Sequence, residues 1–258
     1  MRITKIEKKK RLYLLELDGK ESLYITEDTI VRFMLSKDKE ITENELQEIR
    51  DFAQFSYGKN IALYFLSFKQ RTKKEMLDYL NKYEIKEANA VKIITALEEE
   101  RWIDDKSYVE TYVRQNGLNG DKGPALIRQK LITKGISKSV IDSCLVEVDF
   151  SNLIEKVAEK LLRKYQDKLP IRALQDKIVQ GLMNKGFTYD LARKTVGQLD
   201  ISADDNMEAD LISKELEKLY RKYSRKYDGY ELKQRLIQAL ARKGFEFDQI
   251  QAVLRNYL

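Results

Sequence analysis

The sequence contains no histidine, a single cysteine and only two prolines among its 258 residues. The lack of histidine excludes the Ser-His-Asp triad, Cys-His nucleophiles and histidine-based zinc sites. Because Cys144 is alone, the chain cannot form an intrachain disulfide, and this fits a reducing compartment such as the cytoplasm. Since Ile141 and Leu145 flank Cys144, we predict that Cys144 is a small buried side chain.

Long apolar runs are missing as well. No stretch approaches the roughly 20 apolar residues that cross a bilayer, and no secretory signal is expected at the N-terminus. The sequence has no Walker-type loop and no GxGxxG motif. Its 43% hydrophobic and 35% charged residues are typical of amphipathic helices with solvated outer faces. We therefore expect a cytoplasmic, helical protein with no cofactor and no membrane segment.

The net charge of +6 is unevenly distributed along the chain. Residues 1–115 carry 22 basic and 22 acidic side chains, whereas residues 116–258 carry 26 basic and 20 acidic ones. The whole positive excess thus lies in the C-terminal part. This excess is compatible with an anionic partner such as nucleic acid, although a surplus of this size is also ordinary for a soluble protein.

The N-terminal residues have a pattern of their own. Arg11–Leu17 and Ser22–Ile25 are predicted to be strands, and Asp18-Gly19 between them favours a type I′ turn because both residues tolerate a positive φ. A lone hairpin is marginal in water, so we expect it to pack against a helix. Helices are predicted at Glu27–Leu35 and after Thr42, where Thr42 and Glu45 form a capping-box pattern.

From about residue 61 an apolar pattern recurs four times. Its centres are separated by 51, 51 and 58 residues, and the positions five and nine residues to either side of each centre are apolar as well. The centres are Ile85, Ile136, Phe187 and Phe245. Positions −9 and −5 share one face of a helix, as do positions +5 and +9 of the next. The pattern predicts a helix, a tight turn and a second helix.

Glycine precedes the centre in three copies, at Gly135, Gly186 and Gly244, each after a lysine. Glycine can take the left-handed conformation that ends a helix. The first copy has Glu84 at this position, so we expect its turn to close differently.

A third amphipathic helix follows the pair in three copies, at Lys106–Gln115, Ser151–Tyr165 and Met207–Tyr223. The predicted division is an N-terminal unit 1–60, three-helix repeats 61–115, 116–168 and 169–223, and a truncated two-helix repeat 224–258. Such units bury their faces against their neighbours. We therefore predict an all-α fold of tandem three-helix repeats in a curved, elongated array, with a small N-terminal β-hairpin.

The densest acidic cluster is Glu98–Glu100 followed by Asp104 and Asp105. It could hold a divalent metal ion for phosphoryl transfer. We favour a solvated helix end followed by an aspartate that caps the next helix, so no metal or catalytic residue is predicted. Trp102 is expected to be an anchor in the core or between helices.

Basic and aromatic residues alternate in Tyr220–Tyr227. The cations Arg221, Lys222, Arg225 and Lys226 could contact phosphates while the tyrosines stack on bases. A cation-rich helix C-terminus with inward-facing tyrosines explains the segment equally well. The turn lysines Lys134, Lys185 and Lys243 recur in one register, so they could form a row that binds a repetitive anionic partner or could simply be solvated.

Three segments together resemble the RecX family. Ala62–Met76 resembles its opening signature, although Lys69, Thr72 and Met76 stand where arginine, serine and leucine are usual. Trp102–Val109 resembles the family's aromatic–aliphatic–Asp-Asp segment, and Gly123–Ser137 is close to its second-repeat motif. The resemblance covers about residues 60–258.

The resemblance implies a non-enzymatic negative regulator of the RecA recombinase. Such a protein binds the RecA filament on single-stranded DNA and inhibits its extension, ATPase and strand exchange; contact with single- or double-stranded DNA and a monomeric state are also expected. The expected contacts are Arg128, Lys130, Lys134, Lys185, Arg242 and Lys243, beside the cations of Tyr220–Tyr227. The alternatives are a non-catalytic DNA-binding protein, whose affinity would fall steeply with salt, and a helical protein-interaction scaffold.

Overall fold

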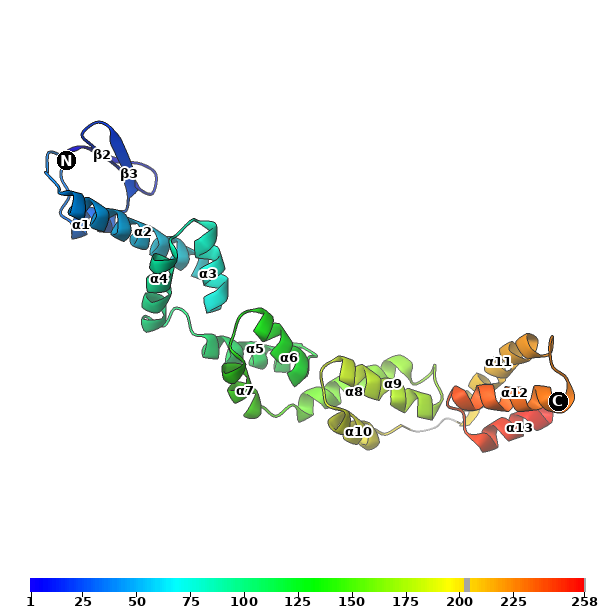
Figure 1. The fold of residues 1–258 in the computed structure, drawn as a ribbon. Coiled ribbons are helices and arrows are strands. Elements are labelled where there is room, and N and C mark those ends of the chain that lie inside the picture. The colour runs from blue at the N-terminus through cyan, green and yellow to red at the C-terminus, as the bar shows by residue number, and fades with distance from the viewer. Residues whose placement is uncertain (202–204, 258) are drawn as a thin grey trace. The chain divides into compact units, whose positions relative to one another are not determined.

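The computed structural model describes residues 1–201 and 205–257, with side chains from residue 208 onward in the second range. A three-stranded antiparallel sheet precedes a series of helices in this part of the chain (Figure 1). The strands are β1 (Ile3–Lys8), β2 (Tyr13–Leu17) and β3 (Glu21–Ile25). The helices are α1 (Glu27–Arg32), α2 (Glu43–Leu66), α3 (Lys73–Lys82), α4 (Glu87–Glu99), α5 (Asp105–Asn119), α6 (Pro124–Thr133), α7 (Lys138–Val146), α8 (Ser151–Tyr165), α9 (Ile171–Asn184), α10 (Tyr189–Gln198), α11 (Asp205–Tyr223), α12 (Gly229–Arg242) and α13 (Phe247–Tyr257).

The chain divides into two compact units. One contains Met1–Tyr112 and Gln129–Val146, and the other contains Val113–Arg128 and Glu147–Leu258. No helix among the described residues is both long enough and apolar enough to cross a membrane.

The predicted hairpin is confirmed as β2 and β3. Asp18 and Gly19 both have positive φ, at 50° and 66°, as a type I′ turn requires. The hairpin is nevertheless only part of a sheet, because β1 pairs antiparallel with β2. β1 was not predicted from the sequence. The only strongly apolar residues of this strand are Ile3 and Ile6, and a run of cations follows them.

The sheet packs on the first two helices, as expected for a small β element. Its buried residues, among them Ile3 and Leu15, share a core with Leu46 and Ile49 of α2. α1 ends at Arg32, three residues before the predicted end. The capping box at the start of α2 is confirmed, since the Thr42 hydroxyl accepts from the Glu45 amide while the Glu45 carboxylate accepts from the Thr42 amide.

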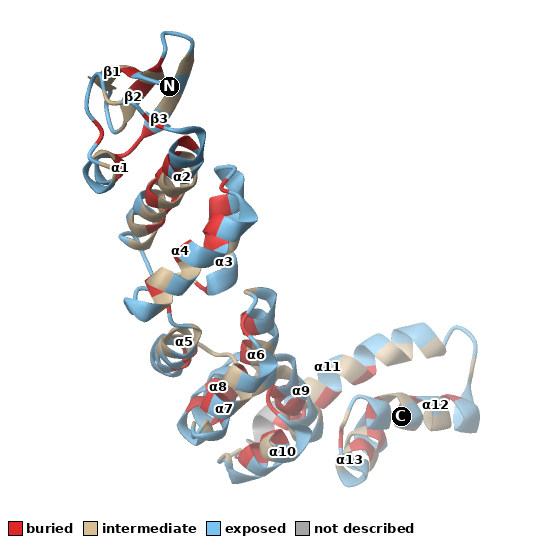
Figure 2. Ribbon diagram, turned by 60° about the vertical axis from the view of Figure 1, so that its left-hand side comes forward, coloured by how far each residue is buried: buried red, intermediate tan, exposed pale blue. Residues whose placement is uncertain are grey.

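The fourfold apolar pattern is confirmed by burial (Figure 2). All of its positions are buried except Ile94, which is partly buried. The buried positions are Met76, Leu80, Ile85, Ala90, Ile127, Leu131, Ile136, Ile141, Leu145, Ile178, Leu182, Phe187, Ala192, Val196, Leu236, Leu240, Phe245, Ile250 and Leu254. Cys144 is also buried, as predicted. Each helix pair therefore uses the predicted faces.

The turn of the first copy closes like the other three, which corrects the expectation for Glu84. Glu84 has a φ of +56°, and Gly135, Gly186 and Gly244 have values from +85° to +95°. In each copy the amide of the apolar centre donates to the carbonyl five residues earlier, as Ile85 does to Leu80 at 3.2 Å. Glu84 thus adopts a conformation that usually favours glycine.

The hydrophobic clusters group the helices differently from the predicted repeats. α8, α9 and α10 share one core, and α11, α12 and α13 share another. The cluster of α3 and α4 includes Ala62 of α2. Hence the helix that the sequence analysis placed last in a repeat packs with the following pair at α8 and at α11. An amphipathic stripe shows that a helix has a buried face but does not show which neighbour covers it.

Candidate partner-binding surface

The three turn lysines form ion pairs. The ammonium of Lys134 lies 2.5 Å from the Glu75 carboxylate at the start of α3. In the second unit, Lys185 lies 2.5 Å from Asp121, which precedes α6. The prediction placed these lysines in one register, and the structure gives each of them an acidic partner from a segment far away in sequence.

Lys243 completes the series. It lies 2.8 Å from Glu215 of α11, and Glu215 also pairs with Lys218 at 3.0 Å. The hydrogen bond from Lys243 and that from Lys218 hold the pKa of Glu215 below its usual value. The hydrogen bond from Lys185 does the same to the pKa of Asp121. Both carboxylates therefore remain charged at neutral pH and balance part of the positive charge at these turns.

The backbone of these turns also forms hydrogen bonds with segments far away in sequence. The Thr72 hydroxyl donates to the carbonyl of Lys134 at 2.8 Å, and the amide of Gly123 donates to the carbonyl of Lys185 at 2.7 Å. A Cβ on Gly186 would lie 2.6 Å from the backbone nitrogen of Leu126. Glycine is therefore needed at position 186 both because Leu126 approaches its backbone closely and because its φ is positive.

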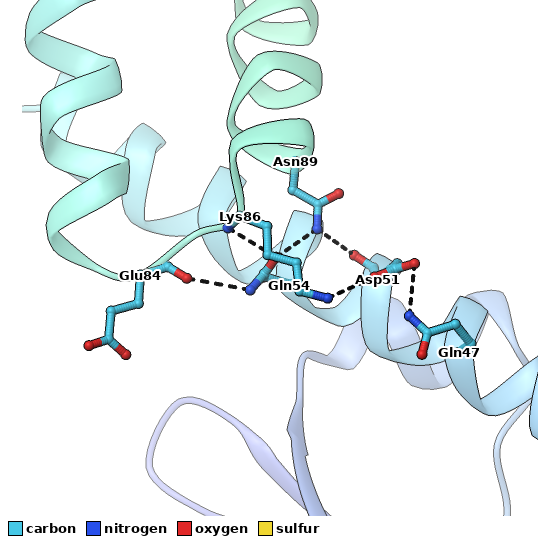
Figure 3. A network of polar contacts seen from close by, with 6 residues as sticks. All are labelled: Gln47, Asp51, Gln54, Glu84, Lys86 and Asn89. Carbon is cyan, nitrogen blue, oxygen red and sulfur yellow. Dashed lines mark hydrogen bonds and ion pairs between the residues drawn. The ribbon is translucent and has the colours of Figure 1, made fainter.

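The first turn docks on α2 through a polar network (Figure 3). The Gln54 side chain donates to the carbonyl of Glu84 at 3.5 Å and accepts from the amide of Lys86 at 3.2 Å. The Asn89 side chain donates to Gln54 at 2.8 Å, and Lys86 lies 3.5 Å from Asp51. This turn is held by side chains, so a residue with a Cβ is tolerated at position 84.

The remaining predicted cations differ in their surroundings. Arg221 pairs with Glu217 at 3.6 Å, and Lys222 lies over the ring of Tyr223. Lys130 lies over the ring of Tyr112 at 5.8 Å. Arg128 is half-buried and already interacts with another group of the protein. Arg225, Lys226 and Arg242 are exposed and have no acidic partner among the described residues.

The tyrosines of Tyr220–Tyr227 serve the core. Tyr220, Tyr223 and Tyr227 are partly buried against the α11–α13 cluster. Tyr220 also packs edge-on against Tyr257, with 5.4 Å between ring centroids. These contacts favour the structural interpretation of the segment for its rings, while Arg225 and Lys226 remain available to a partner.

A cleft of about 370 Å³ adjoins the turn that contains Lys243. Its charged lining consists of Lys168, Lys214, Lys218 and Lys243 with Asp167 and Glu215, and Leu169 and Phe245 supply part of its apolar lining. Lys168 and Lys214 were not predicted from the sequence, because one lies in the loop between α8 and α9 and the other in the middle of α11, and only the fold brings them together. The cleft adds positive charge to the C-terminal cations.

The acidic cluster has structural roles. The Asp104 carboxylate accepts from the amides of Lys106 and Ser107 at 2.8 and 3.2 Å, so it caps α5 as predicted. Asp105 accepts from the amide of Lys73 at 3.0 Å, and burial raises the pKa of its carboxyl. Glu98 pairs with Lys73. Asp104, Asp105 and Glu98 are thus all engaged in contacts within the protein.

The prediction for Trp102 is wrong. The Trp102 side chain is 56% exposed, whereas its neighbour Ile103 is 2% exposed and belongs to the core of α3 and α4. The two residues follow the end of α4, where Arg101 has a φ of +59°. This left-handed residue turns the chain so that Ile103 faces inward and Trp102 remains outside.

Comparison with known proteins then identifies the family. The second three-helix domain of RecX matches residues 104–145, and its third three-helix domain matches residues 147–196 and again 207–254. The chain belongs to the RecX family. The two matches to the third domain coincide with the α8–α10 and α11–α13 cores, so each of these two units is a set of helices that shares a hydrophobic cluster.

Relatives extend the similarity over the whole chain. The regulatory protein RecX of Streptococcus pyogenes serotype M1 is 60% identical over 258 residues, which is 100% of both chains. That of Streptococcus sanguinis strain SK36 is 58% identical over the same full length. A solved structure of regulatory protein RecX has a TM-score of 0.64 and 32% identity over 76% of this chain and 99% of that chain. The RecX structure from Lactobacillus salivarius has a TM-score of 0.55 and 36% identity over 58% of this chain and 98% of that one.

Proposed function

We propose that this protein is a negative regulator of the RecA recombinase in the cytoplasm. It binds the RecA filament on single-stranded DNA and inhibits filament extension, ATPase and strand exchange. The observation that carries the proposal is the 60% identity, over the full length of both chains, to a protein named regulatory protein RecX. Two chains of equal length with this identity are expected to share their architecture and their class of activity.

The arrangement of the residues supports a binding role. The acidic cluster is occupied by capping and ion pairs, and the chain offers no histidine for proton transfer. Tandem three-helix units supply a large surface in relation to their volume, as repeat proteins that bind other macromolecules do. A non-enzymatic regulator is the function that such a chain can perform.

Six of the predicted contacts fall into two groups. Arg225, Lys226 and Arg242 are exposed cations that can pair with phosphates or carboxylates of the filament. Lys134, Lys185 and Lys243 would have to release an acidic partner before they could do so. We therefore propose the first group as direct contacts and the second as residues that hold successive helical segments in position. The protein acts as a monomer in this proposal.

Co-sedimentation tests the proposal. RecA is assembled on single-stranded DNA with a non-hydrolysable ATP analogue, and the fraction of this protein in the pellet is compared with that obtained on DNA alone and with RecA alone. The expected result is saturable pelleting with the filament and much weaker association with either component. Equal association with bare DNA would instead favour a plain DNA-binding protein.

A further inference from the structure

A strip of exposed aromatic rings and cations lies in the first unit, within residues 1–115, which carry equal numbers of basic and acidic side chains. Tyr64 is 53% exposed and Phe68 is 66% exposed, and their rings meet edge-on with 5.0 Å between centroids. The guanidinium of Arg11 lies 5.5 Å from the centre of the Tyr64 ring. Arg11 comes from the loop between β1 and β2, so two distant segments build this end of the strip.

The loop between α2 and α3 continues the strip. Lys69 and Gln70 are exposed, and the guanidinium of Arg71 lies 3.7 Å from the centre of the Phe65 ring. The Nε atom of Arg71 is buried without a hydrogen-bond partner. The guanidinium of Arg71 therefore packs closely on an aromatic face, as arginine side chains commonly do, and it forms no ion pair with a carboxylate among the described residues.

A small hollow ends the strip. It is lined by Gln70, Arg71, Arg101, Trp102, Asp104, Ser107 and Tyr108. Arg101 occupies the left-handed position after α4, its amide donating to Glu98 at 2.9 Å and the Trp102 amide donating to Leu97 at 2.8 Å. Glycine adopts this conformation without strain. An arginine at this position therefore places a cation beside the exposed Trp102 at a conformational cost.

The charges of the strip favour an anionic partner. Arg11, Lys69 and Arg101 have no acidic partner among the described residues. The carboxylates nearby are already engaged: Asp104 caps α5, and Glu75 is paired with Lys134. Glu7, on β1 before the loop, pairs with Lys5 and Lys9. The cations therefore outnumber the free carboxylates along the strip.

We propose that this strip, formed by Tyr64, Phe68 and Trp102 with Arg11, Lys69, Arg71 and Arg101, binds single-stranded nucleic acid. Exposed rings offer faces on which unpaired bases stack, and cations between them pair with the phosphates. A duplex hides its base faces, so it is a poorer ligand. The inference deepens the proposed function, since it supplies a contact to the DNA strand of the filament, but it requires no RecA and can fail or succeed separately.

Trp102 provides a direct probe because it is the only tryptophan in the chain. An oligo(dT) of about 12 nucleotides, within the range of sites for single-stranded DNA, is titrated into the full-length protein without RecA. Stacking on Trp102 should quench its fluorescence in a saturable manner, and the affinity should fall as salt rises. Inorganic polyphosphate, which has charge but no bases, should bind without comparable quenching.

A pair of double variants completes the test, with binding measured by the anisotropy of labelled oligo(dT). Tyr64→Ala with Phe68→Ala should weaken binding about tenfold or more. The matched control is Tyr189→Ala with Phe247→Ala, which removes rings that are 53% and 58% exposed in the second unit. The control should bind within about twofold of the wild type. Circular dichroism verifies that both variants fold.

Three results would overturn the proposal. The first is no binding of oligo(dT), and the second is binding without any change in Trp102 fluorescence, which would place the DNA elsewhere. The third is a Tyr64→Ala/Phe68→Ala variant that binds DNA normally but loses DNA-free association with RecA, which would make the strip a protein interface. If the variant misfolds, the titration of Trp102 in the wild type still decides the question.

Discussion

The amide of Gly123 donates a 2.7 Å hydrogen bond to the carbonyl oxygen of Lys185, so the segment before α6 is bound to the turn between α9 and α10. A Cβ on Gly123 would lie 2.7 Å from the carbonyl carbon of Gly186. The ion pair of Lys185 with Asp121 flanks this contact. The turn motif therefore closes a helix pair and also joins it to another part of the second unit.

The Gly186→Ala substitution should be strongly destabilising. Its Cβ would lie 2.6 Å from the Leu126 nitrogen, and the residue has a φ of +89°. Left-handed backbone costs about 1–2 kcal/mol in an L-residue, and the overlap adds to this cost. We expect urea unfolding to show a loss of about 2 kcal/mol or more. Gly197→Ala is the control, since its Cβ would meet open space in α10, and it should change stability by less than about 1 kcal/mol. Equal effects would contradict the account.

The Glu84→Gly substitution should be stabilising. Glu84 has a φ of +56° in a turn that elsewhere contains glycine, and relief of this strain is worth about 1 kcal/mol. Thermal unfolding should show a higher melting temperature for the first unit. Glu84→Ala retains the Cβ and should show no such gain. A loss of stability in Glu84→Gly would indicate that the Glu84 side chain makes a favourable contact that outweighs the strain.

The turn ion pairs predict a dependence on acidic pH. Lys185 lowers the pKa of Asp121, and Lys243 and then Lys218 lower that of Glu215. A carboxyl whose folded pKa is lowered contributes stability above its unfolded pKa and loses it as the pH falls through the folded value. Stability should therefore decline below pH 4.5, the unperturbed pKa of the Glu215 carboxyl and the higher of the two unperturbed values. Urea unfolding at pH 6 and pH 3.5 measures the decline, which should be smaller in a Lys185→Met/Lys243→Met variant. An equal decline in both would place the titrating groups elsewhere.

Lys185 and Lys226 should behave differently although both are lysines of the second unit. Lys226 is exposed without an acidic partner among the described residues, so Lys226→Met should weaken filament binding and reduce its salt slope by about 1. Lys185→Met removes an ion pair and should cost about 0.2–1 kcal/mol of stability. Its salt slope should remain that of the wild type. A reduced slope in Lys185→Met would make this lysine a direct contact.

The sequence predicted what is local in this molecule. The spacing of Leu182, Phe187 and Ala192 specifies a helix pair and its buried faces, because helical periodicity depends only on near neighbours. The capping boxes at Thr42 and Thr72 were also predictable. The packing of α8 and α11 against the helix pairs that follow them was not predictable, since an apolar stripe does not show which helix covers it.

The candidate binding surfaces could not be predicted in full, because they depend on contacts between residues far apart in sequence. The register of the turn lysines suggested a row of free cations, but nothing in the sequence pairs Lys185 with Asp121. Likewise, Arg11 meets Tyr64 only because the loop between β1 and β2 reaches α2. Trp102 was predicted to be an anchor in the core or between helices because it follows a helix and precedes Ile103, and the left-handed Arg101 directs it outward instead.

The proposed inhibition of RecA can be measured through the DNA-dependent ATPase of RecA. This protein is titrated into the reaction before and after the filament has assembled on single-stranded DNA. We expect inhibition at amounts well below one per RecA, with the order of addition separating blocked growth from disassembly. No inhibition, or inhibition only when the protein is sufficient to coat all the DNA, would contradict it.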